Sequence, residues 1–306
     1  VASANPEEPA AFKMALDLAR KIDADLAMAC DPDGDRIGIA VKNDAGEWTL
    51  LNGNQTNIIF TEYIIRRKKE LNQLKGGEYT VKTIVTTELI KDIAEKNHII
   101  CYDVYTGFKW IADVIRKEGG EKFIGGGEES FGYMPGAFTR DKDGVSATSL
   151  MAEIAAWVKM QNKTLYSFLK EIYAKYGFSQ ERMIYIVRKG LSGAQEIKAM
   201  MEEFRHNTPK EINHSPVVLK KDYLSLEATN LQTGEKTHLN FETKSDVLQF
   251  FLADGSKISV RPSGTEPKIK FYFEARAQMK DMNDYERAQQ DANARIDAII
   301  KDLKLQ

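Results

Sequence analysis

The sequence predicts an α/β protein in which a mixed-sheet α/β domain is followed by a smaller α+β domain. Between residues 77 and 176, short apolar strand patterns alternate with amphipathic helix patterns. After Gly177 the order changes to a strand, a helix, several strands and a final helix. With 306 residues, of which 42% are hydrophobic and 29% charged, the chain is long enough for two or three folded domains. We expect boundaries near residues 45 and 178, which gives domains 1–45, 46–178 and 179–306.

The elements follow from hydrophobic periodicity. Apolar residues at intervals of three or four positions predict helices over 9–21, 54–71, 89–96, 108–117, 146–160, 165–176, 194–205 and 285–303. Short apolar or alternating runs predict strands over 24–30, 37–41, 80–85, 99–104, 122–124, 183–188, 257–260 and 268–273. Ligands usually bind at the carboxyl ends of the strands in such sheets, so polar motifs that follow the strands are candidate sites.

Composition argues against several classes of function. The 43 basic and 45 acidic residues give a net charge of −2, so no global charge excess favours nucleic acid or an anionic membrane as a partner. Neither a run of 18 apolar residues nor a leader pattern is present, so we expect no membrane insertion and no secretion. Cys30 and Cys101 lack the spacing of a zinc site, and we predict two buried thiols in a cytoplasmic, reducing compartment.

Three aspartates occupy every second position directly after predicted strand 24–30: Asp31, Asp33 and Asp35. Hard cations bind several oxygen ligands at close range, so this turn predicts a magnesium site. An EF-hand loop is excluded, because Arg36 and Lys42 stand where its glycine and glutamate are required. A haloacid-dehalogenase-type phosphatase stays open as an alternative, although no later strand ends in the paired aspartates that would complete its metal site.

A glycine-rich segment follows predicted strand 122–124 and continues into Glu128, Glu129 and Ser130. Glycines allow the backbone to approach a ligand closely, and a carboxylate with a hydroxyl can bind sugar hydroxyls. Taken alone, such a segment is more often a tight connection than a site.

A third motif, Arg-Pro-Ser-Gly-Thr-Glu-Pro, lies between predicted strands 257–260 and 268–273. Its arginine, its hydroxyls and its glycine-bearing turn can bind a phosphate, and Lys270 can add charge. The competing interpretation is a hairpin turn with a surface arginine. Two shorter motifs are Thr106-Gly107-Phe108-Lys109, which can hold an anion at a helix N-terminus, and Arg140-Asp141-Lys142-Asp143-Gly144.

In their order and approximate spacing, these five motifs resemble the α-D-phosphohexomutase family, which includes phosphoglucomutases and phosphomannomutases. The resemblance covers nearly the whole chain. It implies that residues 1–45 are the end of domain 2 with its magnesium loop, that 46–178 are the sugar-binding domain 3, and that 179–306 are the phosphate-binding domain 4. It also implies that the N-terminal domain with the catalytic serine is missing from this chain.

The resemblance further implies the roles of individual residues. Asp31, Asp33 and Asp35 would bind Mg²⁺, and Arg36, Lys109 and Lys142 would be catalytic. The substrate-binding residues would be Thr106, Gly107, Glu128, Ser130, Arg261, Ser263, Gly264, Thr265 and Lys270.

The implied reaction of the whole protein interconverts hexose 1-phosphate and hexose 6-phosphate through a phosphoserine and a bisphosphorylated sugar, with hexose 1,6-bisphosphate as activator. The implied partners are a small phosphosugar and the missing N-terminal domains, and this chain alone would be inactive. A non-catalytic sugar-phosphate binding module and a phosphopentomutase of the same family remain as alternatives.

Overall fold

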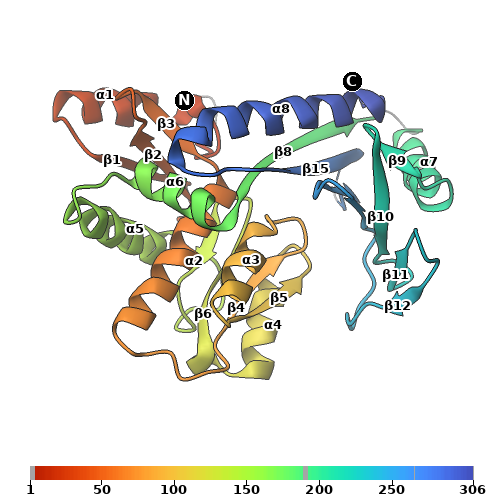
Figure 1. The fold of residues 1–306 in the computed structure, drawn as a ribbon, viewed down its shortest axis with the longest axis horizontal. Coiled ribbons are helices and arrows are strands. Elements are labelled where there is room, and N and C mark those ends of the chain that lie inside the picture. The colour runs from red at the N-terminus through yellow and green to blue at the C-terminus, as the bar shows by residue number, and fades with distance from the viewer. Residues whose placement is uncertain (1–3, 189–191, 265, 306) are drawn as a thin grey trace. The chain divides into compact units, whose positions relative to one another are not determined.

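The computed structural model describes residues 4–188, 192–264 and 266–305. The chain forms two compact units (Figure 1). The first consists of Val1–Tyr176 with Lys280–Met282, and the second of Gly177–Met279 with Asn283–Gln306. Among the helices of the described residues, none combines the length and the apolar composition needed to cross a membrane.

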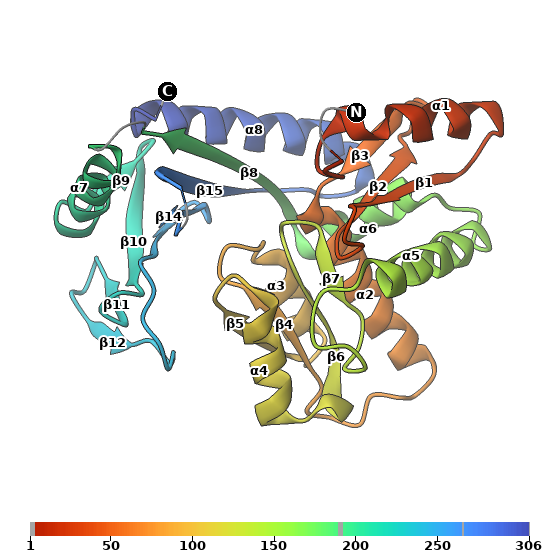
Figure 2. The same cartoon turned by 180° about the vertical axis from the view of Figure 1, so that it is seen from behind.

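The first unit opens with a small antiparallel sheet. A 3-10 turn η1 (Pro9–Phe12) and helix α1 (Lys13–Lys21) precede strands β1 (Leu26–Cys30), β2 (Ile37–Lys42) and β3 (Trp48–Leu51). The strand order is β1-β2-β3, and α1 packs on β1 (Figure 2). Cys30 pairs with Ile37, so the six residues between them form the hairpin loop that carries the three aspartates. The sequence pattern does not predict β3, because four residues are too few to show alternation.

The main sheet of the first unit has the order β5-β4-β6-β7. Strands β4 (Tyr79–Thr83), β5 (Ile100–Val104) and β6 (Phe123–Glu128) are parallel, and β7 (Gly132–Met134) is antiparallel to β6. Helix α3 (Leu89–Lys96) joins β4 to β5, and α4 (Phe108–Glu118) joins β5 to β6 through the 3-10 turn η2 (Gly120–Lys122). These two connections run in opposite directions across the sheet, so right-handed crossovers place α3 and α4 on opposite faces.

Apolar packing holds this sheet and its helices together. Phe108, Ile111 and Ile115 of α4 pack in one buried cluster with sheet residues that include Tyr79 and Val81. Helices α2 (Gly53–Glu70), α5 (Gly144–Lys159) and α6 (Leu165–Tyr176) complete the unit, and α2 contacts β6, α3 and α6. The carboxyl ends of β4, β5 and β6 therefore meet at one edge of the sheet, close to the start of α2.

The second unit is an antiparallel sheet with two helices. Its strands are β8 (Phe178–Val187), β9 (Glu211–Ile212), β10 (Ser215–Asp222), β11 (Glu227–Asn230), β12 (Lys236–His238), β13 (Leu248–Leu252), β14 (Lys257–Pro262) and β15 (Lys268–Ala277). The order is β12-β11-β10-β13-β14-β15-β8, and β9 pairs with β10. Helix α7 (Gly193–His206) contacts β14 and β15, and α8 (Tyr285–Asp302), which follows the 3-10 turn η3 (Met282–Asp284), contacts β15 and β8.

The predicted fold class is confirmed, including helices α3 and α6 at their predicted bounds. Several strand ends were predicted too early, among them those of β6 and β14, which carry candidate motifs. Strand β6 continues to Glu128 and β14 to Pro262, so the glycine-rich segment and Arg261 lie within strands. Glycine and proline weaken a strand pattern, which explains both errors. The prediction of two buried thiols is also wrong, because Cys30 is exposed and Cys101 is half-buried. Cys30 is the last residue of β1, where its side chain stays accessible.

Candidate functional site

The three aspartates of the β1–β2 loop converge. One carboxylate oxygen from each of Asp31, Asp33 and Asp35 lies within 4.8 Å of the other two. Asp31 is buried, Asp35 is half-buried and Asp33 is exposed. Gly34 has a left-handed φ of +71°, which a residue with a side chain rarely adopts, so glycine allows this tight loop.

Hydrogen bonds fix the buried member of this group. Asp31 Oδ1 accepts the backbone N–H groups of Asp35 at 3.2 Å and Arg36 at 3.0 Å, and its Oδ2 accepts Arg36 Nε at 2.6 Å. Burial by itself would raise the pKa of Asp31, but the backbone N–H and guanidinium of Arg36 outweigh it and lower the pKa to about 2. Asp31 is therefore ionised at neutral pH.

Asp35 gives a test of whether a cation fits. Its Oδ1 is buried and accepts no hydrogen bond from the described residues, and Arg36 Nε lies 3.7 Å away. A buried carboxylate oxygen without a hydrogen bond is costly unless another group satisfies it. Three converging carboxylates with such an oxygen fit a hard cation such as Mg²⁺.

Arg36 connects the aspartate loop by hydrogen bonds to residues near the start of the described chain. Besides Asp31, its guanidinium donates to Asn5 Oδ1 at 3.1 Å and to Glu7 Oε1 at 3.2 Å. The side chain is half-buried. These contacts position the loop, and the catalytic role of Arg36 stays a prediction.

Glu128 lies at the end of β6 with only 4% of its surface exposed. Its carboxylate accepts the backbone N–H of Gly107 and, at 3.4 Å, the hydroxyl of Ser130. Burial and the charge of Glu129 raise the pKa of Glu128 to about 7, against the opposing effects of Gly107, Lys142 and Ser130. This carboxyl group can therefore hold or release a proton near neutral pH.

Three segments distant in the sequence meet at this place. Lys142 Nζ lies 2.8 Å from Asp35 Oδ2, and the N–H of Gly144 donates to the carbonyl of Gly34 at 3.0 Å. The N–H of Ile37 donates to the carbonyl of Phe131 at 3.0 Å, which joins the aspartate loop to the β6–β7 hairpin. The fold thus brings the predicted magnesium loop, Lys142 and the Glu128–Ser130 turn together.

Lys142 is held as a cation. Burial would lower its pKa, but the hydrogen bond and charge of Asp35, followed by the charge of Glu128, raise it above the usual lysine value. Lys142 therefore supplies a fixed positive charge between the aspartate loop and Glu128.

Sequence reasoning missed the residues that support the Glu128 turn. Asn57 Nδ2 on α2 donates to the carbonyl of Glu128 at 2.8 Å. The carboxylate of Glu129 accepts the hydroxyls of Thr83 and Thr86, each at 3.2 Å. An asparagine within the apolar face of a predicted helix was the signal that could have identified Asn57.

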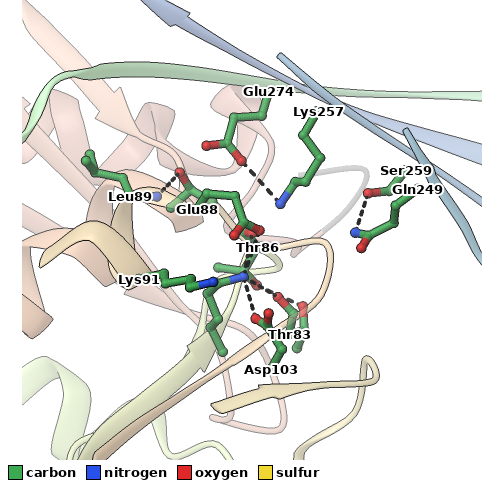
Figure 3. A network of polar contacts seen from close by, with 12 residues as sticks. Thr83, Thr86, Glu88, Leu89, Lys91, Asp103, Gln249, Lys257, Ser259 and Glu274 are labelled. Atoms are coloured by element: carbon green, nitrogen blue, oxygen red, sulfur yellow. Dashed lines mark hydrogen bonds and ion pairs between the residues drawn. The ribbon is translucent and has the colours of Figure 1, made fainter. Parts of the chain in front are cut away.

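A wholly buried lysine organises the loop after β4. Lys82 Nζ lies 2.7 Å from Asp103 Oδ1 and 3.0 Å from Glu88 Oε1, and those carboxylates appear beside Thr83 and Thr86 in Figure 3. Burial would lower the pKa of Lys82, but the charges of Asp103 and Glu88 raise it well above its usual value. No sequence motif marked this ion-pair group.

The structure places the predicted residues Thr106, Gly107 and Lys109 differently with respect to the Glu128 turn. Gly107 reaches Glu128, as described, and its φ of +120° requires glycine. Thr106 beside it is half-buried, whereas Lys109 is exposed with its ammonium 4.9 Å from the centre of the Trp110 ring. Within the described chain, Lys109 has no hydrogen bond or ion pair with another candidate residue.

The predicted phosphate motif forms the β14–β15 hairpin of the second unit. Arg261 at the end of β14 pairs with Lys270 of β15, so two cationic residues are neighbours across the ladder. The N–H of Ser263 donates to the carbonyl of Lys268 at 2.8 Å, and Gly264 is exposed. Thr265 lies outside the described residues.

Fold and site together define an α/β protein in which a loop with three converging carboxylates lies beside a buried carboxyl group of raised pKa. Comparison with known families gives consecutive matches to phosphoglucomutase/phosphomannomutase domain II over residues 1–46, domain III over 52–176 and the C-terminal domain over 196–292, the first two described as alpha/beta/alpha. The chain belongs to the α-D-phosphohexomutase family and corresponds to its C-terminal portion.

Known proteins agree with this assignment. The phosphoglucomutases of Staphylococcus aureus strains N315 and USA300 are each 38% identical over 273 residues, which is 89% of this chain and 48% of theirs. Similar solved folds are the open form of a Paramecium phosphoglucomutase, pp63/parafusin (TM-score 0.64, 19% identity, 98% of this chain and 49% of that one), and a Thermus thermophilus protein described as a putative phosphomannomutase (TM-score 0.60, 18% identity, 99% and 51%). The chain thus spans about half the length of the relatives it matches.

Proposed function

We propose that this chain is part of a phosphohexomutase that interconverts hexose 1-phosphate and hexose 6-phosphate through a phosphoserine and a bisphosphorylated sugar. The observation that carries the proposal is the meeting of the aspartate loop, Lys142 and the Glu128 turn. A metal site beside a polyol site is what phosphoryl transfer to and from a sugar needs. The phosphoglucomutase relatives support the same reaction.

In this proposal, Asp31, Asp33 and Asp35 hold Mg²⁺. The ion, when bound, neutralises charge on a transferring phosphoryl group. The low pKa of Asp31 keeps that ligand ionised, and the unsatisfied Oδ1 of Asp35 supplies a second oxygen. Arg36 holds the loop in shape through Asp31 and adds positive charge beside it.

Glu128 and Ser130 bind sugar hydroxyls in this scheme. With a pKa of about 7, Glu128 can accept or donate a proton at a hydroxyl, whereas Lys142, whose pKa is raised, remains a cation that stabilises phosphate charge. Gly107, which donates a hydrogen bond to Glu128, and Thr106 beside it complete the proposed substrate site. Lys109 is the weaker catalytic candidate, because its ammonium contacts only Trp110 among the described residues.

The β14–β15 hairpin is the proposed anchor for the phosphate that does not react. Arg261 can bind it through a bidentate fork, and Lys270 adds a second charge. Ser263, Gly264 and Thr265 would contribute hydroxyl and backbone donors. Hexose 1,6-bisphosphate, as the reaction intermediate, would act as activator.

A non-catalytic sugar-phosphate binding module is the second candidate, favoured by the fact that the chain spans 48% of its phosphoglucomutase relatives. Phosphopentomutase is a further candidate within the family. The proposed division into domains 1–45, 46–178 and 179–306 is common to all of them.

A coupled assay from glucose 1-phosphate to glucose 6-phosphate, with Mg²⁺ and glucose 1,6-bisphosphate, separates these functions. We expect no turnover by the 306-residue chain, and turnover when it is fused behind the portion of the S. aureus N315 phosphoglucomutase that it does not match. Turnover by the chain alone would contradict the role of a serine outside it. A folded, inactive fusion that still binds the phosphosugar would favour the binding module, and greater turnover of ribose 1-phosphate would favour phosphopentomutase.

Calorimetry tests the two binding sites directly. Asp35→Asn should weaken Mg²⁺ binding, while Asp113→Asn on α4 should leave it unchanged. Arg261→Ala should weaken glucose 1,6-bisphosphate binding by about 2 kcal/mol, the scale of a charged hydrogen bond, whereas Arg287→Ala on α8 should not. If Asp35→Asn bound Mg²⁺ as tightly as Asp113→Asn does, the assigned role of Asp35 would be contradicted. If Arg261→Ala bound the bisphosphate as tightly as Arg287→Ala does, the assigned role of Arg261 would be contradicted.

A further inference from the structure

Strand β8, at one end of the strand order in the second unit, carries exposed apolar side chains (Figure 1). Met183, Tyr185 and Val187 occupy alternate positions and are 43%, 59% and 44% exposed. Alternate residues of a strand project from the same face of the sheet. Large apolar side chains gathered in this way mark a binding surface more often than scattered ones do.

Helix α7 covers the opposite face of this sheet. Ile184, between Met183 and Tyr185, pairs with Phe271 of β15. The ring centre of Phe271 lies 5.9 Å from that of Phe204 on α7. Because successive residues of a strand point to opposite faces, Tyr185 lies on the face away from α7.

On this face, cationic side chains of two neighbouring strands lie beside Tyr185. Tyr185 pairs with Lys270 of β15, and Lys270 pairs with Arg261 of β14. Paired residues share a face and neighbouring strands are about 4.8 Å apart, so these three residues form a row about 10 Å long. The ammonium of Lys268 lies 5.6 Å from the centre of the Tyr185 ring, so the tyrosine is in contact with the cationic group.

The two ends of this row have unused binding capacity. The guanidinium of Arg261 is half-buried and makes no ion pair or hydrogen bond with any other residue that the structure describes. At the other end, the hydroxyl of Tyr185 makes no hydrogen bond within the described chain. Unpaired cations favour an anion, and an aromatic ring offers apolar surface with a polar tip. The row therefore fits a ligand that joins an anionic group to a partly apolar one.

We infer that Tyr185 binds the sugar ring of the phosphosugar whose phosphate is held by Arg261 and Lys270. A hexose ring has C–H groups on its two faces and hydroxyls around its rim, so an aromatic side chain can pack against a face and leave the hydroxyls hydrated. Met183 and Val187 extend the apolar surface along β8. The inference rests on the proposed function, because it takes the phosphate anchor of the β14–β15 hairpin as given.

NMR titration of the 306-residue chain with glucose 1,6-bisphosphate and, separately, with inorganic phosphate tests the contact. The sugar ring protons should shift upfield in the wild-type complex, because they lie over an aromatic ring, and this shift should be absent with Tyr185→Ala. Tyr185→Ala should bind the bisphosphate about tenfold more weakly, the scale of an aromatic contact, and inorganic phosphate less than about twofold more weakly.

Two further variants serve as controls. Tyr185→Phe keeps the ring, so it should retain the upfield shift and most of the affinity for the bisphosphate. Leu231→Ala changes another exposed apolar residue of the second unit and should behave as wild type. If Tyr185→Phe loses as much affinity as Tyr185→Ala, the hydroxyl makes the contact and packing of the ring against the sugar is contradicted.

Arg261→Ala separates this inference from the proposed function. If it weakens binding of both ligands while Tyr185→Ala binds the bisphosphate as wild type does, the phosphate anchor is supported and the sugar contact of Tyr185 is overturned. If Arg261→Ala has wild-type affinity for both ligands, or if the wild-type chain binds neither, the anchor is contradicted and the inference falls with it.

Discussion

Glu128 is a carboxylic acid whose folded environment favours its neutral form. Its pKa rises from 4.5 to about 7, because burial and the charge of Glu129 outweigh its hydrogen-bond donors. The folded protein therefore binds this proton more tightly than the unfolded chain. The resulting stability is fully present below about pH 4.5 and is lost as the pH rises to about 7.

We predict that Glu128→Gln removes this pH dependence. At about 1.4 kcal/mol for each pKa unit, the wild-type protein should lose about 3 kcal/mol of unfolding free energy from Glu128 across this interval. Urea unfolding at pH 5, 6, 7 and 8 measures the effect as the difference between wild type and variant. A constant difference across the series would mean that Glu128 titrates at its ordinary pKa.

Lys82 is the charge that balances Asp103 and Glu88 inside the first unit. Lys82→Met removes the cation but leaves both carboxylates, so we expect a loss of about 3–5 kcal/mol, the usual result of breaking a buried ion pair from one side. Lys91→Met is the matched control, because Lys91 is exposed and lies 3.8 Å from Glu95; its cost should stay within about 0.5 kcal/mol. Denaturant midpoints give both values, and similar small losses would show that Lys82 is not needed to balance these carboxylates.

At the scale of elements, the start of α2 is fitted against the turn after β6. A Cβ added to Gly53 would lie 2.0 Å from the carbonyl oxygen of Glu129. In an open helix, alanine would be better than glycine by about 1 kcal/mol. Here the carbonyl of Glu129 leaves no space for the Cβ of an alanine, so α2 or the Glu128 turn would have to move.

We therefore predict that Gly53→Ala destabilises the protein by about 1–3 kcal/mol, as overpacked substitutions do. Gly264→Ala serves as the control, because a Cβ there has no atom within 4 Å and glycine's left-handed freedom is not required. Thermal unfolding compares the two variants. A Gly53→Ala protein as stable as wild type would show that the turn yields without cost.

At the scale of the whole molecule, the second unit has a core of its own. Buried residues of its sheet, such as Phe271 and Phe273, and of α8, such as Ile296 and Ile299, are contributed from within residues 177–306. Phe178, the first residue of β8, packs against Tyr285, the first residue of α8, with ring centres 5.6 Å apart. This contact joins the first strand of the unit to its last helix.

We predict that residues 177–306 fold when expressed alone, because a unit with its own core can fold independently. Dispersed amide signals in an NMR spectrum and one cooperative urea transition would be the result. Phe271→Ala should lower the transition midpoint strongly, since it empties a buried site at a cost of about 3–5 kcal/mol. A non-cooperative transition in the parent segment would show that its stability depends on the first unit.

Much of the fold was predictable because the hydrophobic periodicity of each segment indicates whether it forms a helix or a strand. Helices α3 and α6 and the parallel strands of the main sheet have clear periodicity, and their chain order implies an α/β sheet. The short strands β3 and β7 were missed, since their pairing is set by neighbours rather than by their own residues. The carboxylates of the aspartate loop were found because three of them stand together in the sequence.

The sequence by itself determined the fold class, the aspartate loop and the motifs that resemble those of the phosphohexomutases. Only the tertiary structure decided that Lys142 pairs with Asp35, that Gly107 binds Glu128, and that Glu128 has a pKa of about 7. The reason is physical: a motif is a local property of the chain, whereas burial and charge depend on groups brought together from distant segments. For the same reason, the ion pairs of the buried cation Lys82 became apparent only once the chain was folded.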